Sequence, residues 1–146
     1  MFPRLKRLLC AGLFVLGTTA ALTVSGTVTA PALPPGTIIL LTGWDVNQRP
    51  SGTTDDPLGF HVLVTPDAGG TTFSGTARTL TQRGDITNGV IQGKSISFTI
   101  EWRNDGKVGL YQGSWFDDGY LRGHAQEQDS SRTAEWWTRY NDWNIS

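Results

Sequence analysis

Tryptophan is the residue type that stands out in this sequence, which has six of them in 146 residues. Large aromatic faces line sites that hold a flat ring, an apolar group or a sugar. The same rings also fill cores, and Trp102 continues the apolar alternation of Ile96, Phe98 and Ile100. Trp136 and Trp137 are adjacent, so in a strand one of the two must face outward. The six are Trp44, Trp102, Trp115, Trp136, Trp137 and Trp143.

The ionisable residues offer no spacing typical of catalysis or metal binding. His61 and His124 are far apart along the chain and have no cysteine partners, so no metal-ligand spacing is present. A Gly-x-Ser-x-Gly nucleophile elbow is also missing. Asp55-Asp56 and Asp117-Asp118 lie in turn-like segments, where aspartate caps backbone N–H groups. We therefore expect a protein that is not an enzyme and has no catalytic residue, no metal and no cofactor. The acids left as candidates are Glu101, Glu127 and Glu135.

Short apolar or alternating runs, each followed by a cluster of Gly, Asp, Asn or Pro, recur along the chain. The clearest is Ser95–Arg103, where Ile96, Phe98, Ile100 and Trp102 share one face of a strand and polar residues occupy the other. Regular spacing of such runs predicts an all-β domain with about eight strands. We expect them over residues 37–44, 59–65, 72–80, 85–92, 95–103, 107–116, 120–127 and 132–140.

Short turns join most of these runs. Asn104-Asp105-Gly106 and Asp117-Asp118-Gly119 have the residue types that hairpin turns need for positive φ. Short connections make neighbouring strands antiparallel, and closure of the meander removes exposed edges. We therefore predict an all-β fold: an antiparallel up-and-down eight-stranded β-barrel over residues 37–146, after an N-terminal signal helix and a spacer at residues 33–36. A two-sheet sandwich is the alternative, and we expect Asp45–Pro57 to be a loop at one barrel mouth.

Several segments resemble avidin-like proteins, whose calycin-type fold is an eight-stranded meander barrel. Leu41–Trp44, together with Asn47 and Ser51, resembles the first strand and loop of that family. The segments that resemble its "TGT", "F-T-V-x-W" and "W-S-G" stretches follow in the same order, at Phe73–Thr76, Phe98–Trp102 and Tyr111–Gly113. The resemblance implies a ligand pocket in the mouth of the barrel.

The residues that this resemblance assigns to the ligand are Trp44, Asn47, Ser51, Thr79, Trp102 and Tyr111. Asn47 and Ser51 would bind the polar head of a biotin-like ligand, Thr79 would donate a hydroxyl, and Trp102 and Tyr111 would form an aromatic wall. Other polar positions of the family differ, since Ala77 stands where the family has a head-group tyrosine. The resemblance thus implies the fold and a mouth pocket more than biotin itself.

The N-terminal stretch has the layout of a secretory signal. Three basic residues within the first seven precede the apolar run Leu8–Leu22, and a small uncharged segment follows. We expect a signal peptide over residues 1–32, cleaved after Ala30 or Ala32, with an uncleaved anchor as the alternative. Cleavage removes the single cysteine, Cys10, so no disulfide can form. It also removes three of the twelve basic residues and none of the thirteen acidic ones, which leaves a net charge of −4.

Charge and resemblance together lead to one expected function and one alternative. A net charge of −4 argues against partners such as nucleic acid or an anionic membrane surface, and we expect no stable membrane insertion after cleavage. We expect a secreted, periplasmic or cell-envelope protein that binds a small ligand in the barrel mouth. The alternative is a module that binds an exported protein partner, such as a hydrolase inhibitor or an envelope-associated structural protein. An oligomer fits either function.

Overall fold

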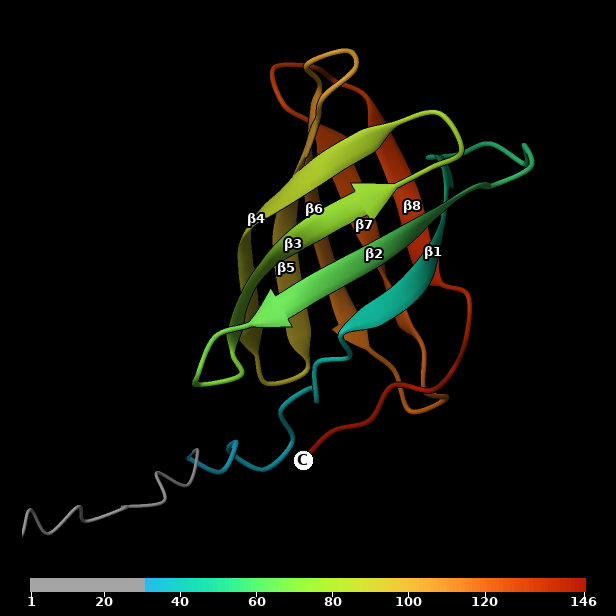
Figure 1. Ribbon diagram of the computed structural model, residues 1–146. Coiled ribbons are helices and arrows are strands. Elements are labelled where there is room, and N and C mark those ends of the chain that lie inside the picture. Colours follow the sequence, from blue (N-terminus) through green and yellow to red (C-terminus); the bar gives the residue numbers. More distant parts are fainter. Residues whose placement is uncertain (1–30) are drawn as a thin grey trace, which may run out of the picture.

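The protein forms a closed antiparallel β-barrel of eight strands, each paired with its neighbours in sequence and β1 with β8 (Figure 1). The computed structural model describes residues 31–146, so the predicted signal helix lies outside the described residues except for its last two positions. The all-β meander barrel is confirmed, and the sandwich is not what the chain forms. The strands are β1 (Gly43–Pro50), β2 (Leu58–Pro66), β3 (Thr72–Arg78), β4 (Arg83–Gln92), β5 (Ser95–Trp102), β6 (Val108–Trp115), β7 (Leu121–Glu127) and β8 (Thr133–Thr138).

The first strand does not lie where the sequence suggested. The predicted strand over residues 37–44 is wrong before Gly43, and the predicted loop Asp45–Pro57 is confirmed only over residues 51–57. The strand β1 spans Gly43–Pro50, pairs with β2 over Gly43–Gln48 and pairs with β8 over Val46–Pro50. The stretch looks like a loop because its outward positions, among them Asp45 and Arg49, are polar, and its inward position Gln48 is polar as well. Hydrogen bonding to two neighbouring strands satisfies its backbone and outweighs the poor hydrophobic pattern.

The barrel interior is filled by side chains from alternate positions of all eight strands. In β5 the predicted alternation is confirmed, since Ile96, Phe98 and Ile100 are buried at 0–2% exposure. In β6 the inward face holds Tyr111, whereas Leu110 points outward and is 40% exposed. The buried apolar cluster is Ile38, Trp44, Val46, Phe60, Val62, Val64, Phe73, Ala77, Ile86, Ile91, Ile96, Phe98, Ile100, Tyr111, Leu121, Ala125, Trp136 and Trp143.

One end of the barrel is closed by the two segments that flank it in sequence. Figure 1 shows the stretch before β1 and the stretch after β8 together at this end. Ile38 and Ile145 form an isolated antiparallel bridge, and the Ser146 N–H donates to the Thr37 carbonyl at 2.8 Å. The Trp143 ring lies edge-on to Trp44, with their centroids 5.0 Å apart. The other end, where β1, β3, β5 and β7 finish, is the barrel mouth.

Two glycines meet where β6 pairs with β7, because Gly113 and Gly123 stand directly opposite each other. A Cβ on Gly123 would collide with the Gln112 carbonyl, and a Cβ on Gly113 would collide with the Trp136 ring. Trp136 lies behind both glycines and donates its indole N–H to the carbonyls of Gln112 and His124, each at 3.1 Å. Glycine therefore relieves crowding at these two positions, whereas Gly93 lies in a turn with a φ of 58° and open space around it.

Replacing Gly123 with alanine should destabilise the protein markedly. The added methyl group meets β6 backbone that cannot move away without breaking strand pairing, so we expect a loss of about 1–3 kcal/mol in the free energy of unfolding. Urea denaturation followed by tryptophan fluorescence measures it. Gly59→Ala is the matched control, because its Cβ would have 3.9 Å of clearance, and it should change stability by less than about 0.5 kcal/mol. Equal stability of the two variants would contradict the close approach.

Candidate functional site

The barrel mouth encloses a cavity of about 790 Å³, a size typical of small-molecule sites. Its walls come from β1, β2, β5, β6, β7 and β8 and from the turns after β3, β5 and β7. Aromatic and aliphatic groups form the inner part, and amide, hydroxyl and charged groups also line it. The lining residues are Gln48, Arg49, Pro50, Leu58, Phe60, Thr79, Gln82, Trp102, Asp105, Lys107, Val108, Gly109, Tyr111, Ala125, Gln126, Glu127, Arg132, Thr133 and Ala134.

Three aromatic rings form the floor of the mouth. Phe60 lies edge-on to Trp102 and to Tyr111, with ring centroids 5.9 Å and 6.0 Å away. Tyr111 in turn stacks on Phe98 at 4.9 Å with nearly parallel planes. Offset-stacked and edge-to-face pairs are the preferred aromatic geometries, so the rings hold one another in position. The floor therefore presents a rigid apolar surface to anything that enters the mouth.

A polar pair is set into this apolar floor. The Tyr111 hydroxyl donates to the Gln48 side-chain oxygen at 2.8 Å, which satisfies a group that would otherwise be buried without a partner. Burial raises the pKa of the Tyr111 phenol well above its usual range, and the nearby Trp102 indole offsets part of that rise. Tyr111 therefore stays neutral and keeps Gln48 in a fixed orientation at the base of the cavity.

Charged side chains lie higher in the mouth. Glu127 stands between two cations, with Lys107 Nζ at 3.9 Å and an Arg132 guanidinium nitrogen at 3.7 Å. The Glu127 side chain is only 27% exposed, whereas that of Arg132 is 74% exposed. Exposed ion pairs of this kind contribute little to stability. Their effect is to give the rim charged groups of both signs around an apolar interior.

The structure brings together three of the six residues expected to bind a ligand. Trp102 and Tyr111 form part of the mouth floor, and Thr79 lies on its wall. The Thr79 hydroxyl accepts the backbone N–H groups of Thr81 and Gln82, at 3.2 and 2.9 Å, and so holds the turn between β3 and β4. The avidin-like resemblance assigns all three to the ligand, and the structure places them on the lining of the cavity.

The other three expected residues lie elsewhere. Trp44 is buried at the closed end, where its ring packs edge-on to Phe73 as well as to Trp143. Asn47 alternates with the inward positions of β1 and so points outward, beside Gly59 of β2. Ser51 is exposed in the turn after β1 and is not among the residues that line the cavity.

Gln48 is the functional residue that sequence reasoning missed. The signal was present, because Trp44, Val46 and Gln48 are spaced two apart and a strand places all three on its inward face. Assigning the segment to a loop hid that alternation. The structure therefore replaces Asn47 by Gln48 as the polar group that β1 supplies to the mouth.

The remaining ionisable candidates are spread over the molecule. Glu101 lies on the outer face of β5 near the Thr87 hydroxyl, and Glu135 pairs with Arg49 on the outer face of β8. His61 Nδ1 lies 2.8 Å from Asp45 on the outside of β1 and β2. Within residues 31–146, no group of three or more His, Cys, Asp or Glu side chains is placed to hold a metal ion. The same part of the chain contains no helix that is long and apolar enough to span a membrane.

Tyr111→Phe should change how stability depends on pH. Unfolded tyrosine ionises near pH 10, whereas folded Tyr111 keeps its proton to higher pH, so the native state binds more protons there and loses stability as pH rises. Tyr111→Phe has no phenol at this position and so lacks this alkaline loss of stability. At neutral pH, however, its free energy of unfolding should be lower by about 0.5–1.5 kcal/mol, because the hydrogen bond to Gln48 is missing. Urea denaturation between about pH 8 and pH 11 should show the gap between the two proteins closing.

Tyr140→Phe is the matched control for this pH series. It removes an exposed phenol and keeps Tyr111, so its alkaline loss should follow that of the parent protein. A gap between parent and Tyr111→Phe that stays constant across the series would contradict the burial of a neutral phenol.

The fold agrees with the avidin-like resemblance at the level of architecture: eight antiparallel strands in sequence order close into one barrel. Comparison with protein-family models and with curated proteins finds no match to this chain. The side chains of the mouth combine an aromatic floor, a neutral hydrogen-bonding pair and a charged rim.

Proposed function

We propose that this protein is an exported, non-enzymatic binding protein that holds a small molecule in the open mouth of its barrel. The observation that carries the proposal is the cavity of about 790 Å³, whose floor is aromatic and whose inner wall holds Gln48. Ligand sites combine a mainly apolar lining with a few placed polar groups that set orientation. The mouth has that combination.

The geometry favours a ligand with a flat apolar ring and a hydrogen-bonding group. The ring would pack on Phe60 and Trp102, which stand perpendicular to each other at the floor. The polar group would reach the Gln48 amide, whose oxygen is engaged by Tyr111 and whose nitrogen is the donor that remains. The polar residues expected to bind the head of a biotin-like ligand do not favour biotin, because Asn47 is on the outer face and Ser51 does not line the cavity.

Export is part of the proposal and depends on the N-terminal sequence. The basic residues and the apolar run of residues 1–22 support a secretory signal and a secreted, periplasmic or cell-envelope location. Mass spectrometry of the exported protein should find an N-terminus at Pro31 or Leu33, the residues after the two expected cleavage points. A chain that keeps its first residues and fractionates with the membrane would support the anchor instead.

Filling the mouth should abolish ligand binding without unfolding the barrel. Ala134 faces inward on β8 and lines the cavity, so Ala134→Phe would occupy the space of the ligand's ring. Leu110→Phe is the matched control, because Leu110 points outward from β6. A thermal-shift screen of ring-containing small molecules should find compounds that stabilise the parent and the control but not Ala134→Phe. A ligand at about 100 times its Kd adds roughly 2.7 kcal/mol to the free energy of unfolding.

The tryptophan signal gives a second measurement of the same binding. Because Trp102 lies on the mouth floor, a bound ring should change the fluorescence of the parent protein, and Trp102→Phe should lose most of that change. A screen in which no compound stabilises the parent would overturn the proposal. So would a compound that stabilises Ala134→Phe as strongly as the parent.

A further inference from the structure

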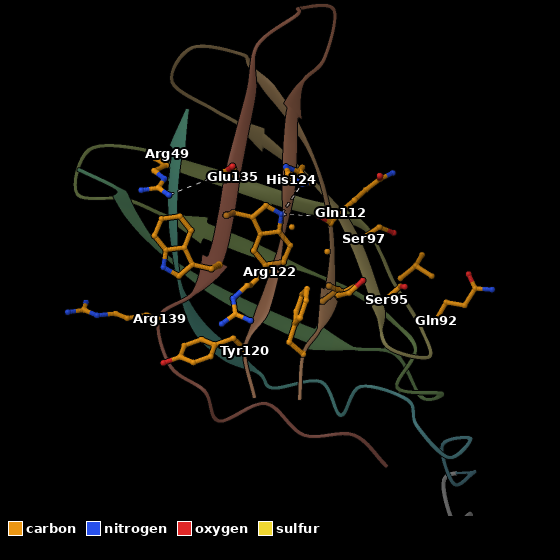
Figure 2. A pocket seen from close by; sticks show the side chains of 18 residues that line it. Arg49, Gln92, Ser95, Ser97, Gln112, Tyr120, Arg122, His124, Glu135 and Arg139 are labelled. Carbon is orange, nitrogen blue, oxygen red and sulfur yellow. Dashed lines mark hydrogen bonds and ion pairs between the residues drawn. The ribbon is translucent and has the colours of Figure 1, made fainter. Parts of the chain in front are cut away.

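A second concave site lies on the outside of the barrel, over the strands from β4 to β8 and β1 (Figure 2). It encloses about 1140 Å³, more than the mouth cavity. The concavity follows from the glycine pair: Gly113 and Gly123 let the β6–β7 backbone come down onto Trp136, so the wall sinks toward the core at this point. We refer to this outer site as the sheet groove.

The chemistry of the sheet groove changes in strand order. On β4, β5 and β6 it is lined by neutral hydrogen-bonding side chains: Gln92, Ser95, Ser97, Gln112 and Ser114. On β7, β8 and β1 and just beyond them it is lined by Arg122, Arg139 and Arg49, with Trp137 among them. Figure 2 shows the same division, with Ser95, Ser97 and Gln92 on one side of the view and Arg49 and Arg139 on the other.

The arginine side concentrates positive charge on an acidic protein. Residues 33–146 carry a net charge of −4, yet the groove lining holds three arginines and one acid, Glu135. Glu135 reaches Arg49 only at 3.5 Å, and Asp118, from the turn before β7, binds Arg122 through two contacts of 3.1 and 2.6 Å. No ion pair of Arg139 is found within residues 31–146, so its guanidinium is free to bind an anion.

Aromatic rings stand next to these guanidinium groups. Arg49 lies over the Trp137 ring at 5.3 Å, and Arg122 lies over Tyr120 at 5.0 Å. Such contacts hold the arginines in place on the groove wall. The same rings offer apolar faces beside a charged group, which is the surface that a sugar ring with an acidic substituent would contact.

We propose that the sheet groove binds a short oligosaccharide that carries carboxylates. Guanidinium groups bind carboxylates in a bidentate manner, and Arg139 is free to do so, whereas Arg49 and Arg122 would have to share their groups with Glu135 and Asp118. The serine and glutamine side chains of the opposite half pair with sugar hydroxyls. Neighbouring strands are about 4.8 Å apart, so the path from β5 to β1 along the curved outer wall is on the order of 20 Å, and a chain of several linked rings would follow that curve. Of its lining residues, only Arg49 also lines the mouth cavity, among the residues that the structure describes.

Two other occupants fit the groove less well. A second copy of the chain or another protein would suit the arginine and aromatic half of the groove, but the other half is lined by three serines, a residue type that is depleted in protein interfaces. Of the exposed large apolar side chains, only Val90 and Phe116 line the groove, and Arg122 lies over Phe116. A nucleic acid needs many free cations along its backbone, whereas Asp118 and Glu135 already pair with two of these three arginines.

The test uses the purified protein and a tetramer of linked hexuronic acids, with the neutral hexose tetramer of the same linkage as the reference. Isothermal titration calorimetry should show the acidic tetramer binding at least about tenfold more tightly, and added salt should weaken that binding. Amide NMR shifts should fall on β5–β8 rather than on the residues of the mouth. Ala134→Phe should leave this binding unchanged, so failure of either site can be told apart from failure of the other.

Matched arginine variants identify the residues responsible. Arg139→Gln should weaken binding of the acidic tetramer by about tenfold. Arg78→Gln removes an exposed arginine from β3, outside the groove, and should leave it unchanged. Asp118→Asn releases the Arg122 guanidinium from its carboxylate partner and should tighten binding.

Four results would overturn the proposal. They are equal affinity for the neutral tetramer, NMR shifts confined to the mouth, no effect of Arg139→Gln, and an acidic tetrapeptide that binds as tightly as the acidic tetramer. The last result would mean that the groove recognises carboxylates without the sugar.

Discussion

Trp136 is the side chain on which both sides of the barrel wall depend. It is 1% exposed, and its indole N–H is shared between carbonyls of two different strands. Inside the barrel its ring contacts Phe98 and Tyr111, with centroids 5.9 and 6.4 Å away. Outside, the glycines that make room for it create the depression that becomes the sheet groove. One buried indole therefore supports the mouth floor and shapes the outer face.

The two ends of the barrel differ because only one of them is filled. At the closed end the flanking segments add Ile38 and Trp143 to the core, and backbone hydrogen bonds to Ser146 hold those segments together. No such segment covers the mouth within residues 31–146, where the floor rings are overlain by polar and charged side chains. A core packed at one end and an open aromatic floor at the other is an arrangement in which a ligand can enter without disturbing most of the buried surface.

Side chains alternate between the two faces of a strand, so adjacent residues of one strand serve the barrel interior and the outer face. In β8, Trp136 faces the core, and Glu135 and Trp137 face the groove. In β1, Gln48 faces the mouth, and Asn47 and Arg49 alternate with it on the outside. A change of one residue in register would exchange these faces, which is why the pairing of β1 with both β2 and β8 decides the function of each side chain.

The sequence by itself determined the fold class and the strongest strands. The alternation in Ser95–Trp102 and the turns ending in Gly106 and Gly119, both with positive φ, follow from local rules that do not depend on the rest of the chain. The avidin-like resemblance assigned Trp102 and Tyr111 to the mouth, and both line its cavity. Only the tertiary structure decided that β1 begins at Gly43, because its polar residues are held by partners distant in sequence, such as Tyr111 at Gln48.

The same holds for the two concave sites. Whether Asn47 or Gln48 faces inward depends on register against β2 and β8. The groove depends on Gly113 meeting Gly123 across two strands and on Trp136 arriving from a third. Local sequence sets which residues alternate, whereas contacts between strands set which face each one occupies, and these contacts exist only when the barrel closes.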